Sequence, residues 1–573
     1  MRSSPLGRGC RPSGLPGVRL ARGDGVGRRW SRLGGDAVWT RHDVGARRPH
    51  GPEATRGGAT VRRRRGAEFA TTPVPTAAGR RAESRCAPHL EGSMSVGSGA
   101  AAPSQSRLTI DYRNTMAAGV GEVDGISDDA LDAIAERVGA ALDRITAEHE
   151  AGGQRWMDLP DDTALAQDVE AYAAEARGRY RDFILVGIGG SSLGAIATVQ
   201  ALANPYRNLL PDAERGGPRF FVLDNPDPER VRATLDAVDL PNTLINVVTK
   251  SGQTAETMAN FLVARDALIA AVGEENHAAQ VVATTDPEEG LLRQLADQAG
   301  YRTFPVPPGV DGRQTVLSAV GLLPAALCGV DGRALLAGAA AMRERCRVRD
   351  VRENPAYLLA ALAYLADQRH GKKILVTMPY ADALFGLGDW FRQLWAESLG
   401  KRLSTRGEEV FAGQTPIKAL GAIDQHSQIQ LYTEGPNDKL IVLVAVGEYR
   451  AKVAIPTPPA GIPDLAYLEG GELGQLLDRE RSATAWALRQ ARRPNLTITT
   501  PTVDAFALGE FFFLHQLQTV MAGSLYDINP FGQPGVEAGK NATYALMGRG
   551  GYEGLRAELT AAPEDADRYA LAP

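Results

Sequence analysis

The 573-residue sequence has little cysteine and no long apolar run. Its four cysteines, Cys10, Cys86, Cys328 and Cys346, lack CxxC spacing, which excludes a disulfide framework and a zinc site. No stretch approaches the roughly 18 consecutive apolar residues of a membrane helix, and no apolar h-region follows the first arginines. We therefore expect a cytoplasmic protein that has neither a membrane span nor a secretory signal.

Charge is unevenly distributed along the chain. Residues 1–93 hold 19 arginines, no lysine and seven acidic residues, together with many Gly and Pro. Such a segment cannot bury enough apolar surface to offset the entropy of ordering, so we predict a disordered tail. The run Arg62 to Arg65 can be interpreted as a nucleic-acid or targeting patch. We favour the alternative that translation begins at Met94, because the acidic residues fit a transit peptide poorly and no aromatic residues are interleaved for base stacking.

The rest of the chain alternates short apolar runs with helix-length segments. Residues 126–153 have helical periodicity, with a cap signal at Ser127 and a stop at Gly152-Gly153. Runs that are apolar on both faces are typical of parallel strands buried between helices. We predict such strands at 183–190, 220–225, 244–252, 280–286 and 301–306, and again at 372–379, 439–446 and 495–500. The pattern predicts two doubly wound α/β units, whose ligands bind beyond the carboxyl ends of the strands.

The first loop at such a strand end reads GIGGSSLG (187–194). A glycine-rich turn that opens a helix leaves N–H groups free beside the positive end of the helix dipole, which favours an anion such as phosphate. A GxGxxG dinucleotide fingerprint fails at Ser192, and a Walker A motif fails because Ala195 follows Gly194. A tight turn without a ligand remains the alternative for this loop taken alone.

The second loop, TKSGQTAET (249–257), also lies between a predicted strand and a helix. Its hydroxyl groups and Lys250 can bind several oxygens of one phosphate, and Glu256 falls in the first turn of the helix. Helix capping alone is the alternative. Two such loops on neighbouring strands favour a phosphorylated small metabolite over a dinucleotide.

Four further segments carry candidate chemical groups. Arg313 lies in a loop before an apolar helix, where it can pair with an acid or stabilise an oxyanion. Gln393, Glu397 and Lys401 are spaced four apart and are expected on one helix face, with a Glu397–Lys401 ion pair as the alternative. His426, in a polar turn before a strand-like IQLYTEG, is the best acid/base candidate among eight histidines, whereas His515 is expected to be a satisfied core residue. Lys540 follows a Gly/Pro turn and is either functional or a surface lysine.

Six segments together resemble the glucose-6-phosphate isomerase family. They are GIGGSSLG, TKSGQTAET, DGRQTVLSAVGLLP, RQLWAESLGK, DQHSQ and GQPGVEAGK, in the family's order over about residues 180–545. The resemblance implies two sugar-isomerase (SIS) domains, a homodimer, and interconversion of glucose 6-phosphate and fructose 6-phosphate without metal, cofactor or nucleic acid. The domains implied are a tail at 1–93, a helical lead-in at 94–165, a first SIS domain at 166–345 and a second at 346–573 with C-terminal helices.

The resemblance also implies residue roles. Glu397 resembles the base that moves a proton between C2 and C1 through a cis-enediolate, and Arg313 the cation that stabilises this intermediate. His426 resembles the ring-opening acid/base, which reaches the site from the neighbouring subunit, with Lys540 assisting. The implied phosphate ligands are Gly190, Ser191, Thr249, Lys250, Ser251 and Thr254, with Glu256 in support. Gln393 and Gln533 are implied to hold sugar hydroxyls.

The sequence departs from the family pattern at two loops. The second loop has Gly252 and Gln253 where many relatives have a hydroxyl or bulky residue, and Asp311 stands before Gly312-Arg313 where Gly-Gly-Arg is common. Asp311 either turns outward or tempers affinity for a phosphorylated sugar. The alternative functions are an isomerase or a sensor of another sugar phosphate; a nicotinamide oxidoreductase would need the missing glycine fingerprint.

Overall fold

The computed structural model describes residues 105–561 and Leu571. The segment for which we predicted disorder, 1–93, lies outside the described residues. The predicted helix at 126–153 is confirmed as α2 (Asp128–Glu150), and the Ser127 side chain caps it by accepting the Ala130 N–H. Within the described part of the chain, no helix is both long and apolar enough to cross a membrane.

The first sheet contains five parallel strands in the order β3-β2-β4-β5-β6. All residues of β2, β4 and β5 are buried, as expected for strands that are covered on both faces. The five strands predicted between residues 183 and 306 are thereby confirmed. Their bounds are β2 (Asp182–Val186), β3 (Arg219–Leu223), β4 (Thr243–Val248), β5 (Val281–Thr285) and β6 (Arg302–Pro305).

The second sheet has the order β1-β12-β11-β7-β10, in which only β1 is antiparallel to its neighbour. The three predicted strands are confirmed as β7 (Ile374–Pro379), β11 (Lys439–Val446) and β12 (Asn495–Thr500). The edge strands β1 (Thr109–Asp111) and β10 (Thr415–Lys418) were not predicted from the sequence. β1 belongs to the segment expected to be a helical lead-in, so that segment also contributes to the second sheet.

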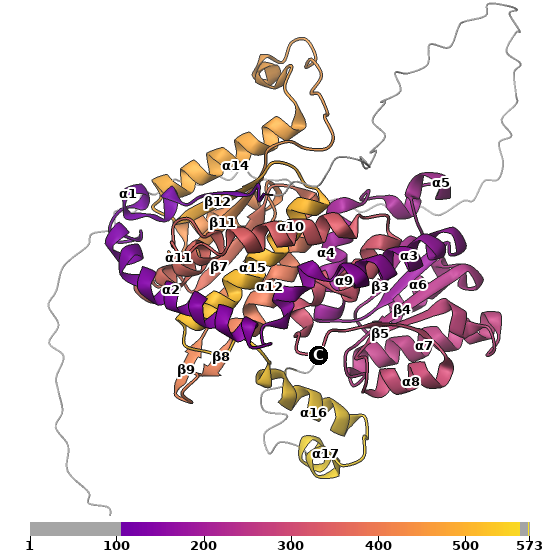
Figure 1. Ribbon diagram of the computed structural model, residues 1–573. Coiled ribbons are helices and arrows are strands. Elements are labelled where there is room, and N and C mark those ends of the chain that lie inside the picture. Colours follow the sequence, from indigo (N-terminus) through magenta and orange to yellow (C-terminus); the bar gives the residue numbers. More distant parts are fainter. Residues whose placement is uncertain (1–104, 562–570, 572–573) are drawn as a thin grey trace, which may run out of the picture. The chain divides into compact units, whose positions relative to one another are not determined.

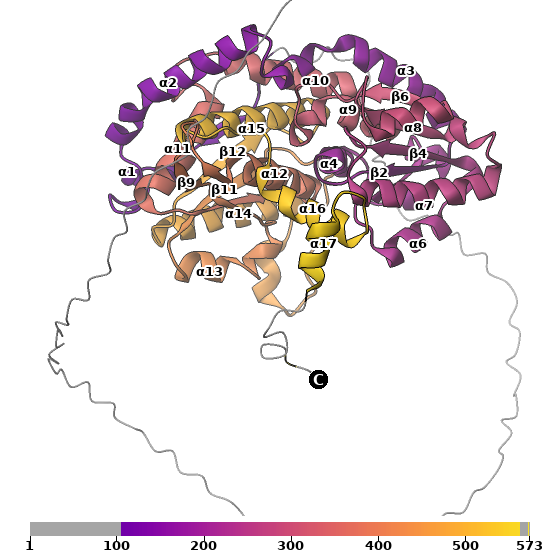
Figure 2. The ribbon, with the colours of Figure 1, turned by 90° about the horizontal axis from the view of Figure 1, so that it is seen from below.

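Helices cover both faces of each sheet, as shown in Figure 2. The first sheet lies between α3 and α9 on one face and α6 and α7 on the other, and the second between α11 and α15 on one face and α13 and α14 on the other. This arrangement confirms the predicted α/β fold with two doubly wound parallel-sheet units. The bounds of these helices are α3 (Thr163–Arg179), α6 (Pro228–Ala237), α7 (Ala255–Val272), α9 (Ala319–Leu327), α11 (Pro355–His370), α13 (Ile429–Glu434), α14 (Leu473–Gln490) and α15 (Ala505–Leu525).

Packing between helices connects the two sheets. Helix α4 (Leu193–Leu202), which follows β2, packs against α12 (Phe385–Leu399), which follows β7. Helix α15, labelled at the centre of Figure 1, contacts α10 (Gly332–Arg345), α11 and α12. Nearly every residue of α15 is buried, including Phe511, Phe512 and Phe513. A helix buried on all sides belongs to the interior of a large core, so this core is common to both sheets.

Two local predictions were wrong. IQLYTEG, expected to be strand-like, forms α13, because the three-residue spacing of Ile429 and Tyr432 turns both side chains toward the core around β7 and β11. The helix that carries Glu397 ends at Leu399, so Lys401 does not share its face but begins strand β8 (Lys401–Leu403). Strand β8 pairs with β9 (Glu409–Ala412) in a hairpin that the sequence analysis did not predict.

Candidate active site

Two loops follow neighbouring strands at the carboxyl edge of the first sheet. The loop after β2 begins at Gly187, the loop after β4 begins at Thr249, and β2 and β4 are paired in parallel. A Cβ added to Gly187 would lie 3.3 Å from the carbonyl oxygen of Val248, so the loops begin close together. The expectation that the two glycine- and hydroxyl-rich loops are neighbours is confirmed.

Gly190 is the point at which the first loop touches the segment that carries Arg313. A Cβ added there would lie 2.2 Å from the carbonyl carbon of Gly312 and 2.6 Å from the amide nitrogen of Arg313. Only glycine permits this approach of two backbones. Ser191, the next residue, is half-buried in the short helical turn η3 (Gly189–Ser191) that leads into α4.

The second loop is organised by its own hydroxyl groups. Thr249 is buried; its Oγ1 accepts the Gly252 N–H at 3.3 Å and lies 3.4 Å from Thr254 Oγ1. Lys250 and Ser251 are exposed, and Lys250 makes no side-chain hydrogen bond or ion pair with the described residues. Hydroxyl, ammonium and backbone N–H groups at the start of α7 form an arrangement that suits an anion.

The Arg313 side chain is buried, and each of its three nitrogens has a partner. Nε donates to Ser398 Oγ at 2.7 Å, Nη1 to Gln533 Oε1 at 3.0 Å, and Nη2 to the Pro530 carbonyl at 2.6 Å. These partners come from α12 and from the segment after α15, so the planar guanidinium is fixed by groups distant in sequence. A fixed guanidinium is suited to an oxyanion that forms during a reaction.

Glu397 faces Arg313 from α12. Its Oε2 lies 3.5 Å from Arg313 Nη1, and its Oε1 accepts a hydrogen bond from Gln393 Nε2 at 3.1 Å. Gln393 in turn touches the first loop, because a Cβ on Gly189 would lie 2.8 Å from its Nε2. Burial lowers the pKa of the Arg313 guanidinium, whereas the charges of Asp311 and Glu397 oppose this change. The Glu397 side chain is 34% exposed, so part of it remains open to a ligand.

Lys401 holds the end of α12 but does not pair with the Glu397 carboxylate. Its Nζ donates to the main-chain carbonyls of Glu397 at 2.6 Å, Ser398 at 3.0 Å and Gly532 at 3.1 Å. The alternative Glu397–Lys401 ion pair is therefore wrong for the side chains. Burial and the nearby Arg313 charge lower the pKa of the Lys401 ammonium to about 8.

Asp311 turns inward. Its carboxylate lies 3.1 Å from Arg313 Nη2, and its Oδ2 accepts the Gly532 N–H at 2.8 Å. This orientation was left open by the sequence, and Ser398 was not predicted as a partner of Arg313. The contacts of Asp311 with Gly532 and of Arg313 with Ser398 have no local sequence signal, because each joins segments that are far apart along the chain.

Lys540 lies on α16 (Glu537–Leu546) and is exposed. Its Nζ pairs with Glu537 Oε1 at 2.9 Å and does not contact the Glu397 group. The same helix reaches the second loop through Tyr544, whose hydroxyl donates to the Gln253 carbonyl at 2.6 Å. The structure thus brings α16 into contact with the second loop, whereas the Lys540 ammonium faces solvent.

His426 is also exposed, and no hydrogen bond or ion pair joins its side chain to this group. It follows the short turn η9 (Ile423–Gln425) after β10, and its ring makes no hydrogen bond with the described residues. His515, in contrast, is confirmed as a satisfied core histidine. Its Nδ1 lies 2.8 Å from Gln518 Oε1, and burial lowers its pKa to about 4.

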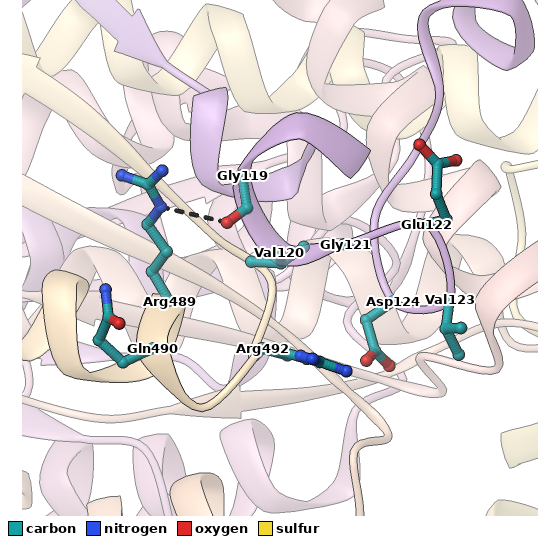
Figure 3. A pocket seen from close by; sticks show the side chains of 9 residues that line it. All are labelled: Gly119, Val120, Gly121, Glu122, Val123, Asp124, Arg489, Gln490 and Arg492. Atoms are coloured by element: carbon teal, nitrogen blue, oxygen red, sulfur yellow. Dashed lines mark hydrogen bonds between the residues drawn. The ribbon is translucent and has the colours of Figure 1, made fainter.

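A separate cavity lies away from these elements. It measures about 470 Å³ and is lined by residues 119–124 and by the end of α14. Figure 3 shows Arg489 at its edge, with Nε bonded to the Gly119 carbonyl at 3.1 Å. None of the predicted site residues lines it. Among the residues that the structure describes, no three His, Cys, Asp or Glu side chains gather in a way that could hold a metal ion.

Solved structures share this fold. A hypothetical protein from Thermus thermophilus is 37% identical, with a TM-score of 0.69 over 77% of this chain and 100% of the other. A glucose-6-phosphate isomerase from Chlamydia trachomatis has a TM-score of 0.66 over 80% of this chain and 90% of the other. At 20% identity, this second likeness concerns the fold alone.

Curated relatives match most of the chain. The chain is 44% identical over 454 residues to a glucose-6-phosphate isomerase from Carboxydothermus hydrogenoformans, covering 79% of this chain and 97% of the relative. It is 46% identical over 451 residues to one from Rubrobacter xylanophilus, covering 78% and 99%. The family described as Phosphoglucose isomerase matches residues 164–448. The chain therefore belongs to the phosphoglucose isomerase family.

Proposed function

We propose that this chain is an aldose-ketose isomerase that interconverts D-glucose 6-phosphate and D-fructose 6-phosphate. The observation that carries the proposal is the 3.5 Å approach of the Glu397 carboxylate to the Arg313 guanidinium, beside two loops suited to a phosphate. The names of the relatives from Carboxydothermus hydrogenoformans and Rubrobacter xylanophilus support the same reaction.

The phosphate group of the substrate binds at the two loops in this proposal. Loop hydroxyls and the free N–H groups at the starts of α4 and α7 supply the hydrogen bonds, and Lys250, whose ammonium has no partner among the described residues, supplies the charge. Gly190 keeps the first loop against Gly312, so the phosphate end and the Arg313 end of the substrate are set at a fixed separation. The proposed ligands are Gly190, Ser191, Thr249, Lys250, Ser251 and Thr254.

The reacting carbons lie at Glu397 and Arg313. A proton alpha to a carbonyl is only weakly acidic, so a carboxylate has to take it while a fixed cation stabilises the enediolate oxygen. In our proposal Glu397 takes the proton from C2 and returns it to C1, and Arg313 stabilises the oxyanion. Gln393 and Gln533, which hydrogen-bond to Glu397 and Arg313 respectively, hold the sugar hydroxyls.

Ring opening is assigned to His426 with Lys540. The sugar arrives as a closed hemiacetal, which needs an acid and a base before isomerisation begins. His426 is exposed and no hydrogen bond or ion pair joins it to Glu397 within one chain, which supports a role in the site of a partner subunit. We therefore propose a homodimer with shared sites, acting in the cytoplasm in glycolysis and gluconeogenesis.

A coupled assay tests the reaction. The purified chain is given fructose 6-phosphate with glucose-6-phosphate dehydrogenase and NADP, beside a reaction that lacks the chain. We expect NADP reduction only where the chain is present. No reduction, with fructose 6-phosphate still bound in calorimetry, would replace the proposal by a sensor or an isomerase of another sugar phosphate.

A further inference from the structure

The N–H group and the carbonyl group of Gly532 both hydrogen-bond to charged side chains. The N–H donates to Asp311 Oδ2 at 2.8 Å, and the carbonyl accepts from Lys401 Nζ at 3.1 Å and from Arg313 Nη2 at 3.3 Å. Asp311 follows the first sheet, Lys401 follows α12, and Gly532 lies between α15 and α16. Three segments far apart in the sequence therefore meet at one residue.

Gly532 directly precedes Gln533. Gly532 has a φ of +65°, a left-handed conformation that side chains rarely adopt, and this conformation turns the chain into Gln533. The Gln533 carboxamide then accepts from Arg313 Nη1 at 3.0 Å. The direction of the Gln533 side chain thus depends on how the Gly532 backbone is oriented.

The hydrogen-bond donors of Lys401 equal its acceptors in number. An ammonium group has three N–H donors, and Lys401 has three carbonyl partners, on Glu397, Ser398 and Gly532. Asp311 accepts from Gly532 while its charge is paired with Arg313. Charge-assisted hydrogen bonds of this kind restrict geometry more than neutral ones.

We propose that Asp311 and Lys401 are positioning residues that orient the Gly532 backbone and so fix Gln533 for the hydroxyl groups of a sugar phosphate. This inference rests on the proposed function and assigns to it two residues that do not themselves touch the substrate.

Coupled kinetics with Gln533→Ala as a reference background test the proposal. Asp311→Ala and Lys401→Met are each expected to lower kcat/KM for fructose 6-phosphate by about tenfold in the wild-type background but by less than about twofold with Gln533→Ala present, because residues that act through one group are not additive. A full tenfold loss in the Gln533→Ala background would overturn the proposal.

Two further variants separate positioning from general stability. Asp311→Asn keeps an oxygen that accepts the Gly532 N–H, so it should retain kcat/KM within about threefold of wild type. Asp236→Ala, which breaks an exposed pair with Arg232 on α6, should leave kinetics unchanged. An Asn variant as impaired as the Ala variant would assign the effect to charge and not to orientation of Gly532, which overturns the role of Asp311.

Hydrogen–deuterium exchange gives a readout that needs no substrate. In the full chain, Asp311→Ala and Lys401→Met should speed exchange in peptides covering 530–536 and leave α15 protected. Unchanged exchange at 530–536 would overturn the proposal even if activity fell. Faster exchange in these variants, with a wild-type chain that proves inactive on fructose 6-phosphate, would refute the proposed function while leaving the Gly532 contacts supported.

Discussion

Arg313 Nη1 lies 3.5 Å from Glu397 Oε2, and the same guanidinium group donates from Nε to Ser398, the residue after Glu397. The cation and the carboxylate are therefore held by one turn of α12 and cannot drift apart independently. The carboxylate has the nearby positive charge, a hydrogen bond from Gln393 and an open side. This is the geometry that enolisation requires, with a proton acceptor on one side and a stabilising charge beside it.

Replacing Glu397 by Gln tests the base. The amide keeps the shape and the contacts of the side chain but cannot accept a proton, so kcat should fall by on the order of 10² or more with little change in KM. The coupled assay measures both constants. Glu136→Gln, an exposed change on α2, is the matched control and should behave as wild type. Activity retained in Glu397→Gln would show that another group is the base.

Removing the Lys250 ammonium tests the phosphate loop. Lys250→Ala should raise KM for fructose 6-phosphate by about tenfold while kcat changes less, because a charge-assisted contact to the non-reacting phosphate is lost in ground and transition states alike. Lys452→Ala removes an exposed lysine outside the loops and should leave KM unchanged. A normal KM in Lys250→Ala would move the phosphate elsewhere.

Hybrid dimers test whether His426 acts across the interface. Two differently tagged subunits, one Glu397→Gln and one His426→Ala, are co-expressed, and the hybrid is purified through both tags. If His426 serves the partner's site, each hybrid has one complete site and about half of the wild-type activity, whereas both parent homodimers stay inactive. An inactive hybrid would place His426 in the site of its own subunit, and an active His426→Ala homodimer would place it outside catalysis.

The lowered pKa of Lys401 predicts a pH-dependent contribution to stability. In the folded chain its pKa is about 8 and its ordinary value is 10.5. Between these values the unfolded chain binds more protons, so the contribution of Lys401 to the free energy of unfolding rises with pH. Urea unfolding of wild type and Lys401→Met at about pH 7 and about pH 10 should show the difference shifting in favour of wild type as pH rises. A difference that is constant with pH would contradict the burial of a charged Lys401.

Much of the fold was accessible from the sequence because its strands are buried on both faces. Such strands read as continuous apolar runs, and every predicted run became a strand. Edge strands β1 and β10 and hairpin β8–β9 were missed, because exposed or short strands carry a weak pattern: β9 is exposed over Glu409, Val410 and Phe411. The helix α13 was missed because six residues are too few to separate a three-residue period from alternation.

The candidate site was predictable in its loops but not in its connections. Glycine and hydroxyl residues between a strand and a helix have a local meaning, so the loops after β2 and β4 could be assigned to one edge of a sheet. The bonds from Arg313 to Ser398, Gln533 and Pro530 are set by packing of distant segments. The roles of His426 and Lys540 remain predictions, since both side chains are exposed and lie outside this bonded group.

Helix α15 has a consequence for how the described part of the chain unfolds. It is buried around its whole circumference and packs against α10 and α11 as well as α12. Exposing any of its sides to water carries a hydrophobic cost. Removing the helices that cover one sheet would therefore expose apolar surface on helices that pack against the other. We expect the two sheets to unfold as one cooperative unit, because a fragment with the second sheet alone would expose to solvent the face of α15 that packs against α10.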